Sequence, residues 1–261
     1  NEKILARQEA IKELADKPDW RQHLFARARL SRDDRGAYEK ITTWSRSKEK
    51  TPGTLLNIMS YLLPVITVSS ILLYYFDVHR YFLLVSAALV VTNLSVLMAQ
   101  YVRIRRVLFE SGSIHDTIRQ YSRMISAIER ENFTSALLRS LKSAFENEGG
   151  SADAQVKEFS SLFNSLSMVN KSIGSFILNG LFLYHLHVLK KFYRWKERYG
   201  AHIPAWLDVL GEFESLNSFA TFWYNNPGFV FPELNTEETI ELVEAGHPLI
   251  RSVSRVNNDV R

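Results

Sequence analysis

The chain has 261 residues, 46% hydrophobic and 23% charged, which is enough to bury a sizeable core and excludes a disordered tail. With 11 Gly, 7 Pro and no Cys, it has few positions for the tight turns of a strand-rich fold and none for disulfides, thiolate metal sites or a cysteine nucleophile. The net charge of +4 is uneven: residues 200–261 carry 3 basic and 9 acidic residues, so the rest of the chain has an excess of ten positive charges.

The first thirty residues predict two short helices separated by a break. Ile4, Ile11 and Leu14 are spaced by seven and three, which places them on one helical face. Pro18 and Asp19 then interrupt the run and suit the first turn of a second helix. The chain starts inside a charged helix without an initiator Met, so we expect it to be a piece of a longer protein.

Two long apolar runs follow, and each is long enough to cross a bilayer. Leu55–Phe76 has 22 residues without a charge and Phe82–Val102 has 21; about 20 helical residues span a hydrocarbon core of about 30 Å. The short linker predicts a tight hairpin. Basic residues flank both outer ends, as expected on the cytoplasmic side of a membrane: Arg46, Lys48, Lys50, Arg103, Arg105 and Arg106. Tyrosines near the run ends suit the membrane interface: Tyr74, Tyr75, Tyr81 and Tyr101.

The same two runs have a second interpretation. They contain more polar residues than an average span needs: Ser60, Thr67, Ser69, Ser70, Thr92, Asn93 and Ser95. A helix that is apolar all round also occurs at the centre of a large soluble bundle. Composition leaves both the membrane hairpin and the buried core open.

Beyond Arg106 the pattern predicts long amphipathic helices. Apolar residues repeat at three and four from Ile114 to Phe145, Glu146–Asp153 ends the helix, and a second helix runs from Ala154 towards Lys171. Phe176–Leu189 is short for a span and predicts a buried core helix. It contains His185 and His187, which lie two apart, point to different sides of a helix and cannot share a metal.

The stretch Lys190–Arg198 alternates five basic residues with three aromatic ones, namely Phe192, Tyr193 and Trp195. It has three interpretations. It is the solvated end of a helix with its rings in the core, a nucleic-acid contact, or a segment at a membrane surface.

Catalytic and metal motifs are absent from the sequence. It contains no glycine-rich phosphate loop, no HExxH and no GxSxG. Glu212 and Glu214 lie two apart on a predicted helix, so they do not form an acid–base pair. We therefore predict no catalytic residue and no metal ligand in this chain.

Both ends of the chain carry a family resemblance. Leu207–Leu234, followed by Gly246-His247-Pro248 and by Asn258-Asp259, resembles the MutS family of mismatch-repair ATPases where its core and lever helices meet the ATPase domain. Leu216, Phe219 and Ala220 match the helix pattern, and Pro232-Glu233 matches the exit. Arg7–Leu14 is similar to the opening helix of the family's core domain. The two apolar runs depart from a standard mismatch-repair protein and indicate a membrane-associated branch.

The resemblance implies an ATPase domain after Arg261, with its phosphate-binding loop beyond this chain. The family's adenine pocket lies just before that loop, which implies Val256 for packing on the base, with Asn257 and Asn258 adjacent. ATP and Mg are the cofactors implied for the intact parent, and none is expected for this fragment, which lacks the loop and is expected to be inactive alone. The implied partners are DNA, a second copy in a homodimer, and a membrane; no nucleic-acid-binding residue is implied.

The predicted fold is mostly all-α, with long antiparallel helices of a MutS core and lever type, a transmembrane hairpin and a short β segment at the C-terminus. The expected domains are core helices 1–53, the hairpin 54–102, core and lever helices 103–234, and the start of a truncated ATPase domain 235–261. The expected function is coupling ATP-driven dimer closure to DNA binding. The alternatives are a membrane-anchored ATPase with a non-DNA partner and a soluble structural bundle. The expected location is the cytoplasmic face of the inner membrane, or alternatively the cytoplasm.

Overall fold

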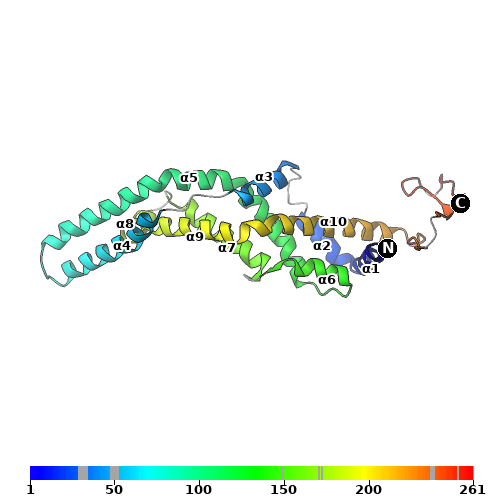
Figure 1. Cartoon of the computed structure of the whole chain (residues 1–261), viewed down its shortest axis with the longest axis horizontal. Helices are drawn as coiled ribbons and strands as arrows, with labels where there is room; N and C mark the ends of the chain where they lie inside the picture. The colour runs from blue at the N-terminus through cyan, green and yellow to red at the C-terminus, as the bar shows by residue number, and fades with distance from the viewer. Residues whose placement is uncertain are drawn as a thin grey trace.

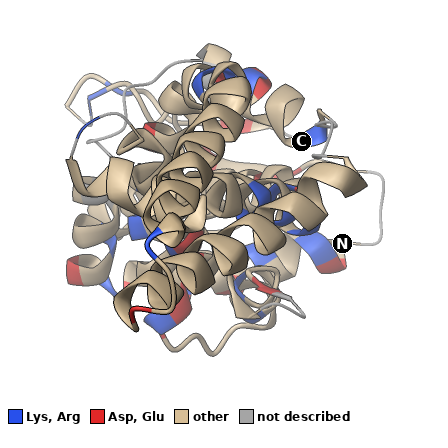
Figure 2. Cartoon of the chain, turned by 90° about the vertical axis from the view of Figure 1, so that its left-hand side faces the viewer, with Lys and Arg blue, Asp and Glu red and all other residues tan. Residues whose placement is uncertain are grey.

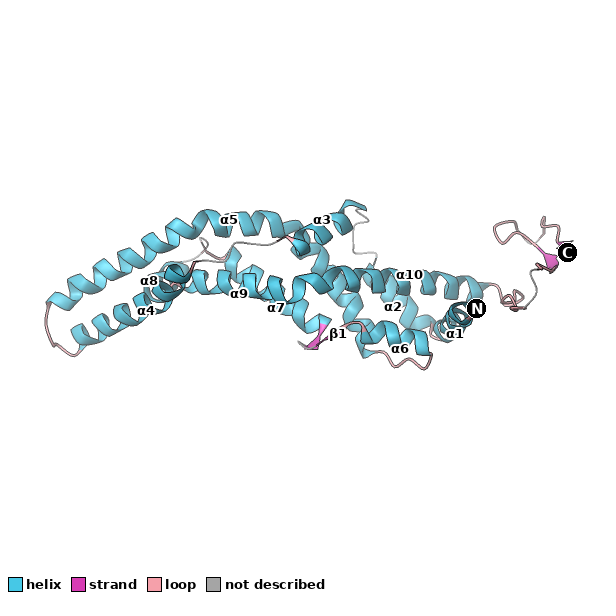
Figure 3. Cartoon of the chain, viewed as in Figure 1, coloured by secondary structure: helices cyan, strands magenta, loops and turns pink. Residues whose placement is uncertain are grey.

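The fold is an elongated arrangement of helices with an apolar hairpin at one end and a short β segment at the other (Figures 1 and 3). This computed structural model describes residues 1–28, 35–47, 53–147, 150–169, 171, 173–235, 239–251 and 253–260. The prediction of a mostly helical chain is confirmed, as are the two long apolar helices and the C-terminal strands.

The helices, in chain order, are α1 (Glu2–Ala15), α2 (Pro18–Ala28), α3 (Arg35–Arg46), α4 (Thr54–Tyr75), α5 (Tyr81–Arg130), α6 (Ala136–Ser143), α7 (Ala152–Ser167), α8 (Ile173–Phe182), α9 (Tyr184–Tyr199), the 3-10 turn η1 (Gly200–His202) and α10 (Ile203–Asn225). Two antiparallel strand pairs complete the described chain: β1 (Glu146–Asn147) with β2 (Gly150–Ser151), and β3 (Leu242–Ala245) with β4 (Asn258–Val260).

Helix α5 is the longest element and joins two segments that the sequence suggested separately. Its 50 residues give a rod of about 75 Å at about 1.5 Å per residue. The second apolar run forms its first half, and the amphipathic pattern forms its second half without a break. The hairpin and the helical body are therefore connected by one continuous helix.

The amphipathic helix that we predicted through Phe145 is wrong at its end. The helix stops at Arg130, and Glu131–Ser135 form a turn before α6. Ser135 begins α6, because its hydroxyl accepts a hydrogen bond from the backbone N–H of Leu138 at 3.3 Å. The apolar spacing continues across this turn because both helices cover the same core, so periodicity alone does not reveal the break.

A second rod runs beside α5 and consists of α9, η1 and α10. Gly200 at its centre lies close to the backbone of α3, since a Cβ at this position would stand 2.9 Å from the carbonyl oxygen of Ser45. A larger residue would push α3 away. Both rods run from the hairpin end of the molecule towards the end that holds the N-terminus and the C-terminal strands (Figure 1).

An aromatic cluster forms the centre of the body. Phe159 of α7 is fully buried and stacks on Trp195 of α9, with 4.7 Å between ring centroids. Trp44 of α3 and Phe192 of α9 each lie 5.6 Å from the same ring. Three helices that are distant in sequence thus meet on one side chain.

The single core helix predicted over Phe176–Leu189 is also wrong. The segment folds as α8 and α9, which meet at Leu183. Leu183 has φ of 50°, a left-handed conformation that is uncommon for a branched side chain, and its side chain is buried. Most of the apolar side chains of α8 lie on the surface rather than in the core.

Candidate functional site

Helices α4 and α5 form a hairpin whose apolar side chains point outwards. In the most apolar stretch of each helix, only 17% of α4 and 11% of α5 is buried, although both are long and apolar enough to cross a membrane. Viewed from the hairpin end, the nearest helices are almost free of charge, and Lys, Arg, Asp and Glu lie mostly around and behind them (Figure 2). A helix at the centre of a soluble bundle is mostly buried, whereas the apolar stretches of these two helices are mostly exposed.

The inner face of the hairpin is polar, and we refer to Ser60, Thr67, Ser70, Ser86 and Asn93 as the polar seam. All five side chains are buried. The hydroxyls of Ser70 and Ser86 lie 2.9 Å apart. The amide of Asn93 donates to Thr67 Oγ1 at 3.1 Å and to the carbonyl oxygen of Gly180 at 2.7 Å. Polar residues inside and apolar residues outside are the arrangement by which helices associate in lipid.

Pro64 leaves one backbone carbonyl of α4 without its helical hydrogen bond, and a side chain of α9 lies beside this carbonyl. A proline within α4 cannot donate to the carbonyl four residues earlier, which is that of Ser60. His187 Nε2 lies 2.9 Å from this carbonyl oxygen and serves as its donor when the proton is on Nε2. Burial lowers the pKa of His187, against the opposing effect of the Ser60 carbonyl, so the ring is neutral at pH 7.

This pairing predicts a dependence between two substitutions. His187→Leu leaves the Ser60 carbonyl without a partner and is expected to destabilise the fold by about 1–3 kcal/mol. In a Pro64→Ala background the restored N–H at position 64 takes the carbonyl, so His187→Leu costs less there. Thermal unfolding of the four proteins in detergent, followed by circular dichroism, measures this coupling. Equal losses in both backgrounds would show that His187 does not serve the freed carbonyl.

Lys190 lies at the base of the hairpin, buried against α4. Its ammonium donates to Asn57 Oδ1 at 2.6 Å and to the hydroxyl of Ser60, and it lies 4.7 Å from the ring centroid of Tyr61. No carboxylate among the described residues forms an ion pair with it. Burial lowers the pKa of Lys190, and the nearby Arg194 lowers it further. A lysine at this level places its charge at the end of the apolar stretch, as it does at a membrane boundary.

Charged residues lie at both ends of the α4–α5 hairpin. Arg103, Arg105 and Arg106 follow the apolar half of α5, and Arg46 ends α3; Lys48 and Lys50 lie outside the described residues. At the opposite end the chain turns at Asp77, whose φ of 54° is one that Asp tolerates better than most residues.

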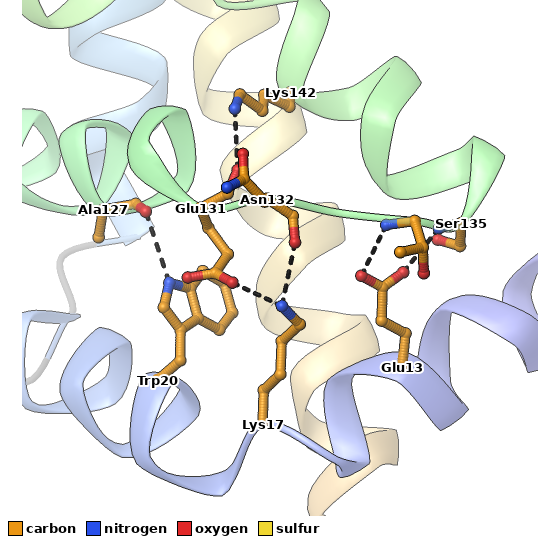
Figure 4. Close-up of polar contacts among 9 residues, drawn as sticks. Glu13, Lys17, Trp20, Ala127, Glu131, Asn132, Ser135 and Lys142 are labelled. Carbon is orange, nitrogen blue, oxygen red and sulfur yellow. Dashed lines mark hydrogen bonds and ion pairs between the residues drawn. The ribbon is translucent and has the colours of Figure 1, made fainter.

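A clasp of polar contacts holds the far end of α5 to α1 and α2 (Figure 4). The ammonium of Lys17 contacts Glu131 Oε1 at 2.5 Å and the carbonyl oxygen of Asn132 at 3.0 Å. Lys142 donates to the carbonyl oxygen of Glu131 at 2.8 Å. Glu13 accepts the backbone N–H groups of Thr134 at 2.8 Å and of Ser135 at 2.7 Å. The α1–α2 segment thus fixes the position at which the chain leaves α5 and turns towards α6.

Glu13 contributes to this clasp only as a carboxylate. Burial alone would raise its pKa, but the N–H donors of Ser135 and Thr134 outweigh burial and hold the pKa below the ordinary value of 4.5. The stabilisation is therefore present above pH 4.5 and is lost as the pH falls through the lowered value.

We expect Glu13→Gln to destabilise the chain by about 1–2 kcal/mol at pH 7, because a charged acceptor at the start of α6 is replaced by a neutral one. The difference from the parent chain should shrink at lower pH, where the carboxyl is protonated. Denaturant unfolding at a series of pH values tests this. The control is Glu9→Gln, an exposed position one turn earlier on α1. A Glu13→Gln deficit that stays constant down to acid pH would contradict the assignment.

The aromatic residues of Lys190–Arg198 turn inwards. Phe192, Tyr193 and Trp195 are all buried. Trp195 donates through Nε1 to the carbonyl oxygen of Gln155 at 2.9 Å. Of the three interpretations of this stretch, burial supports the one with its rings in the core, and buried rings are not available to stack on bases.

The predicted nucleotide residues lie together at the C-terminal strands. Val256 is exposed, Asn257 accepts from Arg255 Nε at 3.2 Å, and Asn258 pairs with Ala245. A Cβ on Gly246 would stand 2.3 Å from Asn257 Oδ1, so the Asn257 and Arg255 side chains fold back over this glycine. The role of these residues in nucleotide binding stays a prediction.

Sequence reasoning missed the connection between α4 and α9, because a proline in an apolar run and a histidine 123 positions later show no common pattern. Within the described part of the chain, no group of three or more His, Asp or Glu side chains is placed to hold a metal ion. Comparison of the chain with protein-family models, with curated proteins and with solved structures finds no match.

Proposed function

We propose that this chain is the core and lever of a MutS-like ATPase that the α4–α5 hairpin anchors in a membrane. In this proposal the lever couples ATP-driven closure of a dimer to a partner at the membrane. The observation that carries the membrane part is the orientation of the hairpin, with an apolar surface outside and the polar seam inside. The basic flanks support a cytoplasmic location for the two outer ends of the hairpin, at the inner membrane.

The rods support the lever part of the proposal. Helix α5 runs without interruption from the hairpin to the clasp at Glu131, and α9, η1 and α10 run beside it towards the C-terminal strands. A continuous helix transmits a displacement along its axis because its backbone hydrogen bonds resist bending. Movement at the C-terminal strands would thus reach the hairpin.

The ATPase part rests on the family resemblance. ATP and Mg would bind in the intact parent, where Val256, Asn257 and Asn258 would lie beside the adenine and a homodimer would form. The test is the coding sequence beyond Arg261, where the proposal expects the phosphate loop GxxxxGK[ST]. A continuation without such a loop would refute the ATPase part and leave the membrane part untouched.

DNA is the second candidate partner. The ten excess positive charges of residues 1–199 favour it, because phosphate contacts need Lys and Arg. The hairpin end offers little to DNA, since Asp77 and Arg80 are its only Lys, Arg, Asp or Glu residues between Thr54 and Val102. A DNA surface would therefore lie on the body of the molecule.

Fractionation of cells that express the chain tests the membrane part. We expect recovery with the membranes, resistance to alkaline carbonate and release by detergent. Recovery in the soluble fraction without detergent, as monodisperse protein, would refute the anchor and favour the soluble bundle.

Duplex DNA binding by the detergent-purified chain tests the second candidate. Fluorescence anisotropy at 50 and 200 mM salt should show affinity that falls by orders of magnitude if several phosphates are contacted, as is typical of phosphate binders. Absent or salt-independent binding would exclude DNA as the partner of this chain.

A further inference from the structure

We propose that α8 is a third membrane element, which enters only the leaflet nearest the basic flanks and presents its outer face to lipid acyl chains. This inference rests on the proposed membrane anchor and adds a second contact with the same bilayer.

The buried and the exposed residues of α8 differ sharply. The buried ones, Ser175, Asn179 and Gly180, are small or polar and form what we refer to as its inner face. Five apolar side chains are exposed around most of the remaining circumference and form its outer face: Ile173, Phe176, Ile177, Leu178 and Phe182. No Lys, Arg, Asp or Glu occurs within the helix, so its exposed face has the composition of a lipid contact rather than of a surface helix in water.

The inner face joins α8 to the hairpin at close range. Asn93 of α5 donates to the carbonyl oxygen of Gly180 at 2.7 Å. A Cβ on Gly180 would lie 3.0 Å from Val90 Cγ1, so only glycine permits this approach without displacing a stiff side chain. Small residues and a polar bridge are how helices pack within a bilayer. The outer face of α8 therefore continues the apolar surface of the hairpin.

Several polar groups at the two ends of α8 are hydrogen-bonded within the protein, although His185 Nε2 at the corner with α9 is buried without a partner. The hydroxyl of Ser175 donates to the carbonyl oxygen of Val169 at 2.7 Å. At the corner with α9, the backbone N–H of His185 donates to Asn179 Oδ1 at 3.0 Å, and the Asn179 amide donates to the carbonyl oxygen of Ser175 at 2.7 Å. Internal satisfaction of this kind is a requirement for chain that turns inside hydrocarbon.

The length of α8 and its depth along the hairpin limit it to one leaflet of the bilayer. Its 10 residues extend about 15 Å, half of a hydrocarbon core of about 30 Å. Asn93, which holds Gly180, lies nine residues before Val102, or about 14 Å from the near end of the apolar stretch. The contact thus falls near the bilayer centre, on the side of Arg103, while Lys190 marks the near boundary.

The absence of Cys from the chain permits a direct test. Phe176→Cys on α8 is labelled with an environment-sensitive fluorophore and reconstituted in phosphatidylcholine vesicles with or without brominated acyl chains. Val91→Cys is the matched hairpin position, 63% exposed against 59% for Phe176, and Phe219→Cys on α10, 55% exposed, is the position outside the membrane. Ile177→Cys repeats the measurement on the same face of α8.

We expect brominated lipid to quench the labels at 176 and 177 about as strongly as the label at 91, and to leave the label at 219 unchanged. Quenching at 91 without quenching at 176 and 177 would overturn this inference and leave the anchor intact. If those two labels were also shielded from aqueous iodide, a protein surface would cover α8. Absence of quenching at 91 would refute the anchor itself, and quenching at 219 equal to that at 176 would overturn the inference, because the body would then also touch lipid.

Discussion

One arginine on each apolar helix is expected to remove most of the chain from the membrane fraction. Val65 of α4 and Val91 of α5 are both 63% exposed. Val65 lies ten residues before the end of α4 at Tyr75, and Val91 lies ten residues after the start of α5 at Tyr81. Both therefore lie about 15 Å from the hairpin turn, near the centre of a hydrocarbon core of about 30 Å. An arginine at the centre of a span costs about 2.5–3.5 kcal/mol on insertion.

The double variant Val65→Arg, Val91→Arg should therefore lose carbonate-resistant membrane recovery. The two costs fall on separate helices and are expected to add. At about 1.4 kcal/mol per tenfold, each substitution shifts the ratio of inserted to free chain by roughly a hundredfold. The measurement is the carbonate-resistant share on an immunoblot.

The matched control adds the same charge away from lipid. Phe109 is 89% exposed and lies on the same face of α5 as Val91, five turns further along, and Val230 is 88% exposed after α10. Phe109→Arg with Val230→Arg should leave recovery unchanged. Equal recovery of the two double variants would show that the hairpin surface does not meet lipid.

The second large effect is expected in the body, at Phe159. Phe159→Ala should destabilise the protein by about 3–5 kcal/mol, because it removes a fully buried ring and leaves a cavity between α3, α7 and α9. For a chain of this size the melting temperature should fall by roughly 10 °C.

Near-ultraviolet circular dichroism during heating in detergent is a direct measurement, because Trp195 stacks on the ring that is removed. Phe159→Leu fills part of the cavity and should lose less. Phe109→Ala, at an exposed position, should change stability by less than about 0.5 kcal/mol. A Phe159→Ala loss no greater than that of Phe109→Ala would mean that the aromatic cluster does not hold the three helices together.

The sequence by itself determined the elements with strong local signals. Two charge-free runs predicted α4 and the first half of α5 because an apolar helix needs no partner pattern to be recognised. Pro18 located the break between α1 and α2. A short β segment at the C-terminus was also expected, from the family resemblance, although its role in an ATPase domain stays a proposal.

Only the tertiary structure decided which faces meet. The sequence left the apolar runs as either a core or a membrane hairpin, and the outward orientation of Val65 and Val91 favours lipid. The end of α5 before Glu131 is held by Lys17 and Glu13 of the α1–α2 segment. The buried ammonium of Lys190 has its hydrogen-bond partners, Asn57 and Ser60, on α4. Hydrogen bonds and packing between residues a hundred or more positions apart leave no local periodicity, so the sequence did not predict them.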